Sequence, residues 1–231
     1  MKVELCVASI EGLQIAKELN VDRIELCQNL EQGGMTPSPG FIEYALAYGL
    51  ETHVLIRPRS GGFRYSDDEV EIIVRDILEC KGMGVHGVVV GVLDEKNMIN
   101  RSALELIKRK AGDLEVTFHR AFDDTYDHKK SIDSLIELGI TRILSSGLAR
   151  NVELGSPVLK SMMEHANGRI EIMPGGGVNL NNIKLLCSEV KPDAIHFSGT
   201  TKVQLDEESM FSELVLKPDS GKIRRLMEEI Q

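Results

Sequence analysis

The most informative chemical feature of this sequence is the tripeptide Glu-Leu-Cys, which occurs at residues 4–6 and again at residues 25–27. Each copy lies in a short strand-like run, and one helical pattern separates them, so we expect two neighbouring parallel strands. Side chains alternate along a strand, which places Glu4, Cys6, Glu25 and Cys27 on one face. With the tripeptides in register, Glu4 would lie beside Glu25 and Cys6 beside Cys27. Burying such groups is costly, so this face predicts a functional surface.

The two thiols suggest a metal site. Cys6 and Cys27 on adjacent strands are candidate ligands for a soft ion such as copper(I). Both could equally be small, inert core residues, because the chain has no Cys-x-x-Cys pair.

Acid–base chemistry is a second possibility. His119 ends another strand-like run and would face the two glutamates and Arg57 across the mouth of the fold. Two buried carboxyls there would have pKa values pushed apart. The catalytic candidates are therefore Glu4, Glu25, His119 and Arg57. The alternative is a structural ion-pair network in which the glutamates pair with Arg57.

An anion site is the third possibility. Arg57 and Arg59 flank a proline and precede a flexible glycine pair, an arrangement suited to a carboxylate or phosphate clamp. Three consecutive glycines and a Ser-Gly-Thr run follow the last two strand-like segments, where backbone N–H groups bind phosphate in many barrels. The glycines could also simply make a tight turn. The predicted anion-binding residues are Arg59, Arg120, Gly175, Gly176, Gly177 and Ser198.

Short β-branched runs alternate with amphipathic helical patterns along the whole chain. We expect strands at residues 3–7, 23–27, 52–56, 87–91, 115–119, 142–145, 170–173 and 194–198. Eight such units predict a (β/α)8 TIM barrel as one domain over residues 1–231, with its active site at the carboxyl ends of the strands. A doubly wound sheet is the rival fold, but no glycine-rich turn follows the first strand. Alternation predicts these inward side chains: Glu4, Cys6, Glu25, Cys27, His53, Arg57, Thr117, His119, Ser145, Glu171, Met173, His196 and Ser198.

Local signals predict where some helices begin. Ser38-Pro39 and Ser156-Pro157 each place a capping residue before a proline at the first helical position. Ser66 to Glu69 has the form of a capping box. The stretch 202–216 is a long insertion before the last helix, and we expect it to be a lid or an oligomer contact.

Composition limits the class of partner. The 231 residues carry a net charge of −9 without a basic run, which argues against nucleic acid. We expect no membrane span, because no stretch of 18 apolar residues occurs. The start of the chain has no signal-peptide pattern, and the four cysteines are dispersed, so we expect a cytoplasmic protein with free thiols.

Several strand-end strings together are similar to one known family. They are Arg23-Ile24-Glu25-Leu26-Cys27, Gly33-Gly34-Met35-Thr36-Pro37-Ser38, Ile56-Arg57-Pro58-Arg59 followed by Gly61-Gly62-Phe63-Arg64-Tyr65-Ser66, Thr117-Phe118-His119-Arg120-Ala121-Phe122-Asp123 and Met173-Pro174-Gly175-Gly176-Gly177. In this combination the chain resembles the CutC family.

The resemblance implies a cytoplasmic TIM barrel that forms a homodimer or higher homo-oligomer. It also implies a role in copper homeostasis, with copper(I) binding for which Cys6 and Cys27 are the thiol candidates. The residues themselves keep two alternatives open. One is an isomerase, lyase or hydrolase acting on a small phosphorylated or carboxylated substrate, and the other is a non-catalytic scaffold. The partner is then a copper ion or a small anionic ligand.

Overall fold

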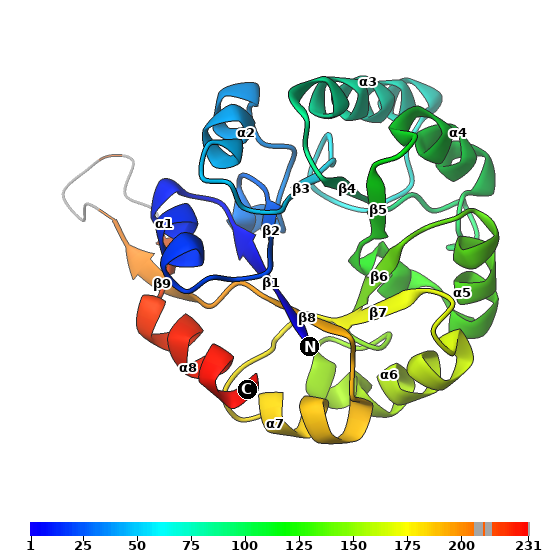
Figure 1. Ribbon diagram of the computed structural model, residues 1–231. Helices are drawn as coiled ribbons and strands as arrows, with labels where there is room; N and C mark the ends of the chain where they lie inside the picture. Colours follow the sequence, from blue (N-terminus) through cyan, green and yellow to red (C-terminus); the bar gives the residue numbers. More distant parts are fainter. Residues whose placement is uncertain (206–209, 211–213, 231) are drawn as a thin grey trace.

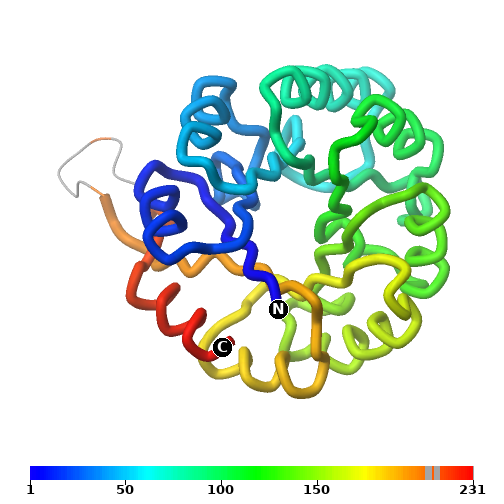
Figure 2. Tube along the Cα trace, viewed as in Figure 1, coloured from blue at the N-terminus to red at the C-terminus, as the bar shows by residue number. Residues whose placement is uncertain are grey.

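Eight parallel strands form a nearly closed barrel in the computed structural model, which describes residues 1–205, 210 and 214–230. The strand order is β7-β6-β5-β4-β3-β2-β1-β8, and an isolated bridge between Gly175 and His196 joins the two ends. Helices form an outer ring around the strands (Figure 1). The chain passes once around this ring from its N-terminus to its C-terminus (Figure 2). The predicted TIM barrel is confirmed.

The barrel strands are β1 Lys2–Val7, β2 Arg23–Leu26, β3 Thr52–Leu55, β4 Gly87–Val90, β5 Glu115–Phe118, β6 Arg142–Ser145, β7 Glu171–Pro174 and β8 Ala194–Phe197. The α-helices are α1 Ile10–Glu18, α2 Pro39–Leu46, α3 Asp67–Met83, α4 Arg101–Ala111, α5 His128–Glu137, α6 Val152–Ala166, α7 Ile183–Leu185 and α8 Ser220–Ile230. Short helical turns complete the loops: η1 Leu30–Gln32, η2 Arg120–Asp124 and η3 Leu186–Val190. All eight expected strands are present, with ends within one residue of the prediction.

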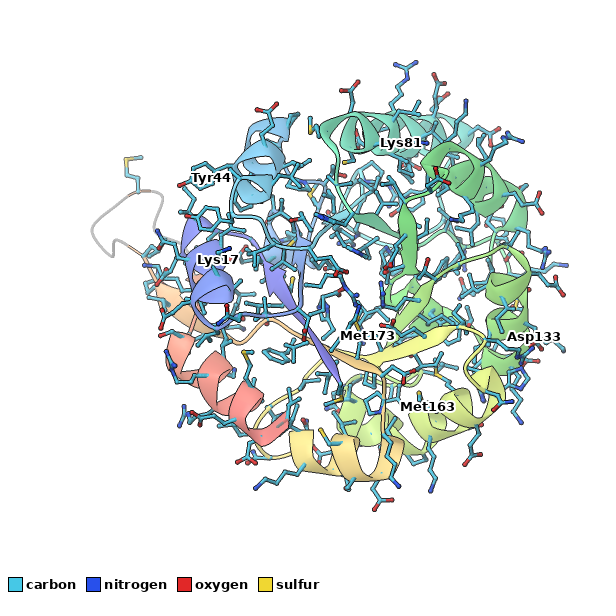
Figure 3. All side chains as sticks on the ribbon, in the orientation of Figure 1. Lys17, Tyr44, Lys81, Asp133, Met163 and Met173 are labelled. Atoms are coloured by element: carbon cyan, nitrogen blue, oxygen red, sulfur yellow. The ribbon has the colours of Figure 1, made fainter. Side chains whose placement is uncertain are left out.

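Strand alternation directs side chains either outward, into the layer between strands and helices, or inward, into the barrel. Outward side chains such as Ile24 and Leu26 join the large apolar core between strands and helices. The inner wall holds two small apolar groups, one around Leu55 and Val89 and one around Leu144, and otherwise polar side chains. Figure 3 shows side chains filling the centre of the ring. The helix–strand layer therefore supplies most of the apolar burial, which leaves the inner wall free to carry charges.

The predicted register between the two tripeptides is wrong. Cys6 lies opposite Glu25, and Glu4 lies opposite Arg23, so the copies are displaced by two residues. The strands of a closed barrel are staggered, and this stagger offsets equivalent positions on neighbouring strands. As a result a glutamate and a thiol are neighbours, instead of two glutamates.

One further expectation about side chains inside the barrel needs correction. The hydroxyl of Ser145 donates to Asp123 and lies 3.8 Å from the sulfur of Met162 on α6, so Ser145 faces the helices. On β6 the inward positions belong to Arg142 and Leu144. Arg142 is fully buried, and the sequence prediction did not include it.

The helix starts agree with the prediction in two of three places. Ser38 caps α2, and Ser66 with Glu69 forms the capping box of α3. Ser156-Pro157 does not start a helix, because Asn151 caps α6 by accepting the N–H of Leu154. Pro157 therefore lies inside that helix.

The insertion after β8 begins and ends as an antiparallel pair, β9 Thr200–Gln204 with β10 Leu214–Pro218. Leu216 donates its N–H to Glu31 of η1 at 2.7 Å. Most of the residues between these strands lie outside the described part of the chain, and so does nearly half of the predicted lid or oligomer contact at residues 202–216. No helix in the described ranges combines the length and the apolar character that crossing a membrane would require.

Candidate functional site

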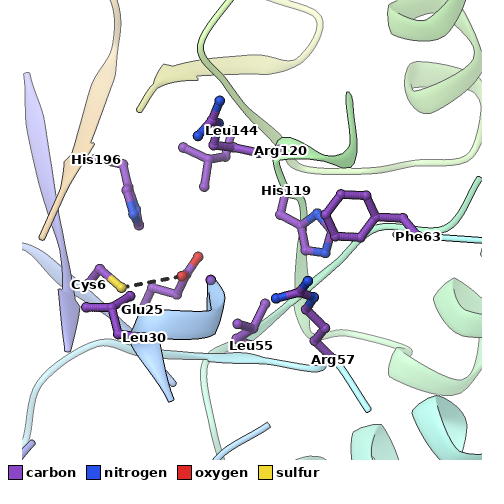
Figure 4. A pocket seen from close by; sticks show the side chains of 11 residues that line it. Cys6, Glu25, Leu30, Leu55, Arg57, Phe63, His119, Arg120, Leu144 and His196 are labelled. Carbon is purple, nitrogen blue, oxygen red and sulfur yellow. Dashed lines mark hydrogen bonds between the residues drawn. The ribbon is translucent and has the colours of Figure 1, made fainter. Parts of the chain in front are cut away.

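A cavity of about 150 Å³ lies at the carboxyl ends of the strands, where the barrel predicts an active site. It brings together residues that are far apart in the sequence. Glu25 and Cys6 line one side, whereas Arg57 and His119 line the other (Figure 4). The complete lining is Cys6, Glu25, Leu30, Gly33, Leu55, Arg57, Phe63, His119, Arg120, Leu144 and His196.

Glu25 is the carboxyl group of this cavity. Its Oε1 accepts a hydrogen bond from Cys6 Sγ at 3.8 Å, and its buried Oε2 has no partner among the described residues. Burial raises the pKa of Glu25 to about 7, with Glu4 adding to the effect and His196 opposing it. A carboxyl with this pKa can both take and give a proton near neutral pH.

Glu4 lies deeper in the barrel and does not line the cavity. It pairs with Arg23, and its Oε1 lies 2.7 Å from His196 Nδ1. Burial opposes ionisation, but the His196 hydrogen bond and the Arg23 charge hold the pKa of Glu4 well below its usual value. Burial also acts to lower the pKa of His196, but Glu25 and Glu4 outweigh it and raise that pKa. Glu4 therefore acts as the counter-ion that orients His196.

His119 presents a neutral N–H to the cavity. Its Nδ1 accepts the N–H of Ala121 at 3.0 Å, which leaves the proton on Nε2. Nε2 is buried and has no partner in the described ranges. Burial, followed by the nearby Arg57 charge, lowers the pKa of His119 to about 3. A Cβ at Gly91 would lie 2.2 Å from the His119 ring, so a glycine at this position makes room for it.

Arg57 carries a buried positive charge that backbone carbonyl groups hold in place. Its guanidinium donates to the backbone carbonyls of Gln32, Gly34 and Gly61 at 2.8–3.0 Å. It also lies over the Phe63 ring, 5.3 Å from the centroid. Within the described ranges no acidic side chain forms an ion pair with it, so the expected network with the glutamates is absent. An uncompensated buried cation points to an anionic ligand.

A second hollow of about 470 Å³ adjoins the first and shares Cys6, Leu30, Arg120 and His196 with it. The predicted anion residues Gly176, Gly177 and Ser198 line it, together with Lys222 of α8. Gly175 lines neither hollow, because it forms the bridge to His196 that joins the two ends of the strand order. Arg59 lies outside both hollows and pairs with Glu69. The structure therefore gathers four of the six predicted anion residues around one opening.

The thiols lie close together despite the corrected register. Cys6 Sγ and Cys27 Sγ are 3.7 Å apart. Ligand atoms of Cys6, Glu25 and His196 all lie within 4.8 Å of one another. The hydrogen bond to Cys27, together with burial, raises the pKa of the Cys6 thiol well above its usual value. These sulfur and imidazole donors fit a soft ion, but the thiols must lose their protons to bind it.

His196 and Phe63 are functional candidates that the residue choice from sequence missed. Alternation did place His196 inside the barrel. Its position near the carboxyl end of the last strand was the signal that could have identified it as a site residue. Phe63 lies in a loop and gave no such signal.

Comparisons with known proteins place these residues in a family context. A family model described as the CutC family matches residues 1–201. A relative from Glaesserella parasuis named family protein CutC is 42% identical over 200 residues, covering 86% of this chain and 82% of its own. A relative of the same name from Vibrio atlanticus is 40% identical over 217 residues, covering 92% of this chain and 88% of its own.

Solved structures give the same picture. The CutC of Streptococcus agalactiae, described there as a candidate copper homeostasis protein, has a TM-score of 0.81 and 38% identity. That match covers 85% of this chain and 97% of the other. A phosphoribosylanthranilate isomerase from Thermotoga maritima has a TM-score of 0.62 at 13% identity, covering 100% of this chain and 98% of the other, and shows the fold alone.

Proposed function

The chain belongs to the CutC family, and from the geometry of its barrel mouth we propose that it binds a small organic anion and exchanges a proton with it. The observation that carries this proposal is Arg57, a buried guanidinium with no carboxylate partner among the described residues. Three backbone carbonyls fix its orientation, so the charge is already in place before a ligand arrives. A carboxylate or phosphate would supply the missing negative charge.

The chemistry follows from the groups around Arg57. Glu25 as a carboxylate takes a proton from a carbon beside a carbonyl group of the ligand. The Nε2–H of His119 donates to the carbonyl oxygen, on which negative charge develops as the C–H bond breaks. Glu25, now protonated, returns the proton to the same carbon, which regenerates the ligand, or to the carbonyl oxygen, which gives its enol tautomer. The raised pKa of Glu25 and the neutral state of His119 suit these two roles.

Cavity size limits the ligand. About 150 Å³ beside Arg57 holds only a few non-hydrogen atoms, and the adjoining hollow with Lys222 can hold a second polar group. Small 2-oxo acids and short sugar phosphates therefore fit best.

Proton exchange with solvent tests the reaction. We would incubate the protein with a panel of 2-oxo acids and sugar phosphates in D2O and follow loss of C–H signals by proton NMR. The wild type should exchange at least one compound, and Glu25→Gln should not. Exchange that persists in Glu25→Gln, or no exchange by the wild type with any compound, contradicts the proposal. Glu43→Gln, an exposed glutamate, is the matched control.

Copper(I) handling is a second candidate, favoured by the 3.7 Å approach of Cys6 and Cys27 beside His196. It agrees with the copper homeostasis role for which the Streptococcus agalactiae relative is named. All four cysteines are free in the structure, which suits a reducing cytoplasmic setting.

Anaerobic competition with a copper(I) chelator separates the two candidates. If copper is the ligand, the double variant Cys6→Ser with Cys27→Ser loses affinity, whereas Cys80→Ser with Cys187→Ser keeps it. Copper(I) affinity should also rise with pH, because binding displaces thiol protons. Equal affinity in both double variants would exclude the mouth thiols.

A further inference from the structure

The opposite end of the barrel carries a separate polar cluster. At the amino-terminal ends of the strands, Glu51, His53 and Glu115 converge from the start of β3 and the start of β5. One ligand atom from each lies within 4.8 Å of the other two. None of the three lines the cavity at the mouth. The mechanism proposed above makes no use of them.

His53 is the unusual member of this cluster. Its side chain is fully buried, and neither ring nitrogen has a hydrogen-bond partner among the described residues. A Cβ at Gly87 would lie 2.6 Å from the ring, so the chain makes room for an imidazole here. A buried imidazole normally satisfies at least one nitrogen, so His53 has a free nitrogen with which to bind a ligand.

The spacing around His53 Nε2 identifies the kind of ligand. Glu51 Oε1 lies 3.5 Å away and Glu115 Oε2 lies 3.7 Å away, which is too long for good hydrogen bonds. Zinc binds imidazole nitrogen and carboxylate oxygen at roughly 2.0–2.2 Å, so tetrahedral ligand atoms lie about 3.4 Å apart. The observed separations are close to this value.

The charges around the cluster favour a cation. The charged network at this end contains the guanidiniums of Arg23 and Arg142, the ammonium of Lys2 near Glu51, and the carboxylates of Glu4, Glu51, Glu115 and Glu171. Three positive and four negative groups leave a net charge of −1 when the histidines are neutral. A bound cation would offset this negative charge.

The arginines and the exposure of the carboxylates are compatible with an ion. Arg23 Nη1 lies 3.4 Å from Glu51 Oε1 and Arg142 Nη2 lies 3.0 Å from Glu115 Oε2, which are the same oxygens that face His53. A carboxylate oxygen has more than one lone pair, so it can accept from an arginine and also bind an ion. The Glu51 and Glu115 side chains are 32% and 45% exposed, so an ion can enter from solvent.

We infer that His53, Glu51 and Glu115 form a binding site for a divalent transition-metal ion such as zinc, completed by solvent, at the amino-terminal end of the barrel. It links β3 to β5 and would stabilise the folded barrel by mass action. This metal site does not depend on the function proposed for the mouth of the barrel.

Calorimetric zinc titration tests this inference in a Cys6→Ser, Cys27→Ser background, which removes the thiols of the mouth. One zinc ion per chain should bind and raise the melting temperature. Glu115→Gln and His53→Asn should each weaken binding by at least about tenfold, and Glu43→Gln should not. Glu115 is half exposed, so its variant should fold even if the His53 variant does not. No zinc uptake by the background protein, or equal affinity in Glu115→Gln, overturns the inference.

Discussion

Replacing Glu25 by glutamine should change how stability depends on pH. Because burial raises the pKa of Glu25 to about 7, the folded protein holds this proton more tightly than the unfolded chain, where the pKa is 4.5. The proton's contribution to stability is fully present below about pH 4.5 and is lost as the pH rises through about 7. At about 1.36 kcal/mol for each pKa unit, the whole effect is about 3 kcal/mol.

Urea unfolding of the wild type and Glu25→Gln at several pH values measures this effect. Between pH 5 and pH 8 the variant should gain about 2 to 3 kcal/mol relative to the wild type, because glutamine does not ionise. The new amide can shift the unfolding free energy by a constant amount at every pH. This does not affect the test, because only the change of the difference with pH is used. For the control Glu43→Gln, the difference in unfolding free energy from the wild type should not change with pH. If the Glu25→Gln difference is equally flat, Glu25 has an ordinary pKa and the reasoning fails.

Three other predictions concern the groups around this carboxyl. Gly91→Ala should cost about 1–3 kcal/mol and displace His119, because its new Cβ meets the ring; Gly82→Ala, with open space around it, should be neutral or stabilising in the same unfolding assay. His119 should stay neutral from pH 8 down to about pH 4 in nitrogen-15 NMR, and protonation near its usual pKa would contradict its burial. Arg23→Met should cost about 3–5 kcal/mol by removing the guanidinium that compensates the buried Glu4 carboxylate, against less than about 1 kcal/mol for the exposed Arg75→Met.

The sequence was sufficient to predict the fold and most of the inner wall. Eight β-branched runs with helical patterns between them allow few other folds, and period-two alternation placed Glu25, His119 and His196 inside the barrel. These inferences rest on local periodicity, which a single sequence contains.

Pairing between strands could not be predicted. The register that sets Cys6 against Glu25 depends on the stagger of the closed barrel, which no local pattern encodes. Arg23 has the same parity as Glu25, but at the first position of its strand a solvated arginine was also possible. Arg142 has the opposite parity to Ser145, so predicting Ser145 inside the barrel places Arg142 on the outward face. Their burial follows from the carboxylates of neighbouring strands, which become visible only when the barrel closes.

Anion binding at Arg57 is the most direct test of the proposed function. Isothermal titration with oxalate, pyruvate and inorganic phosphate should show wild-type binding of at least one of these probes. Arg57→Met should weaken that binding by about 10- to 100-fold, the value of a charge-assisted hydrogen-bond pair. Arg59→Met, outside the cavity, should leave it unchanged. No binding by the wild type, or the same affinity in Arg57→Met, would contradict the account.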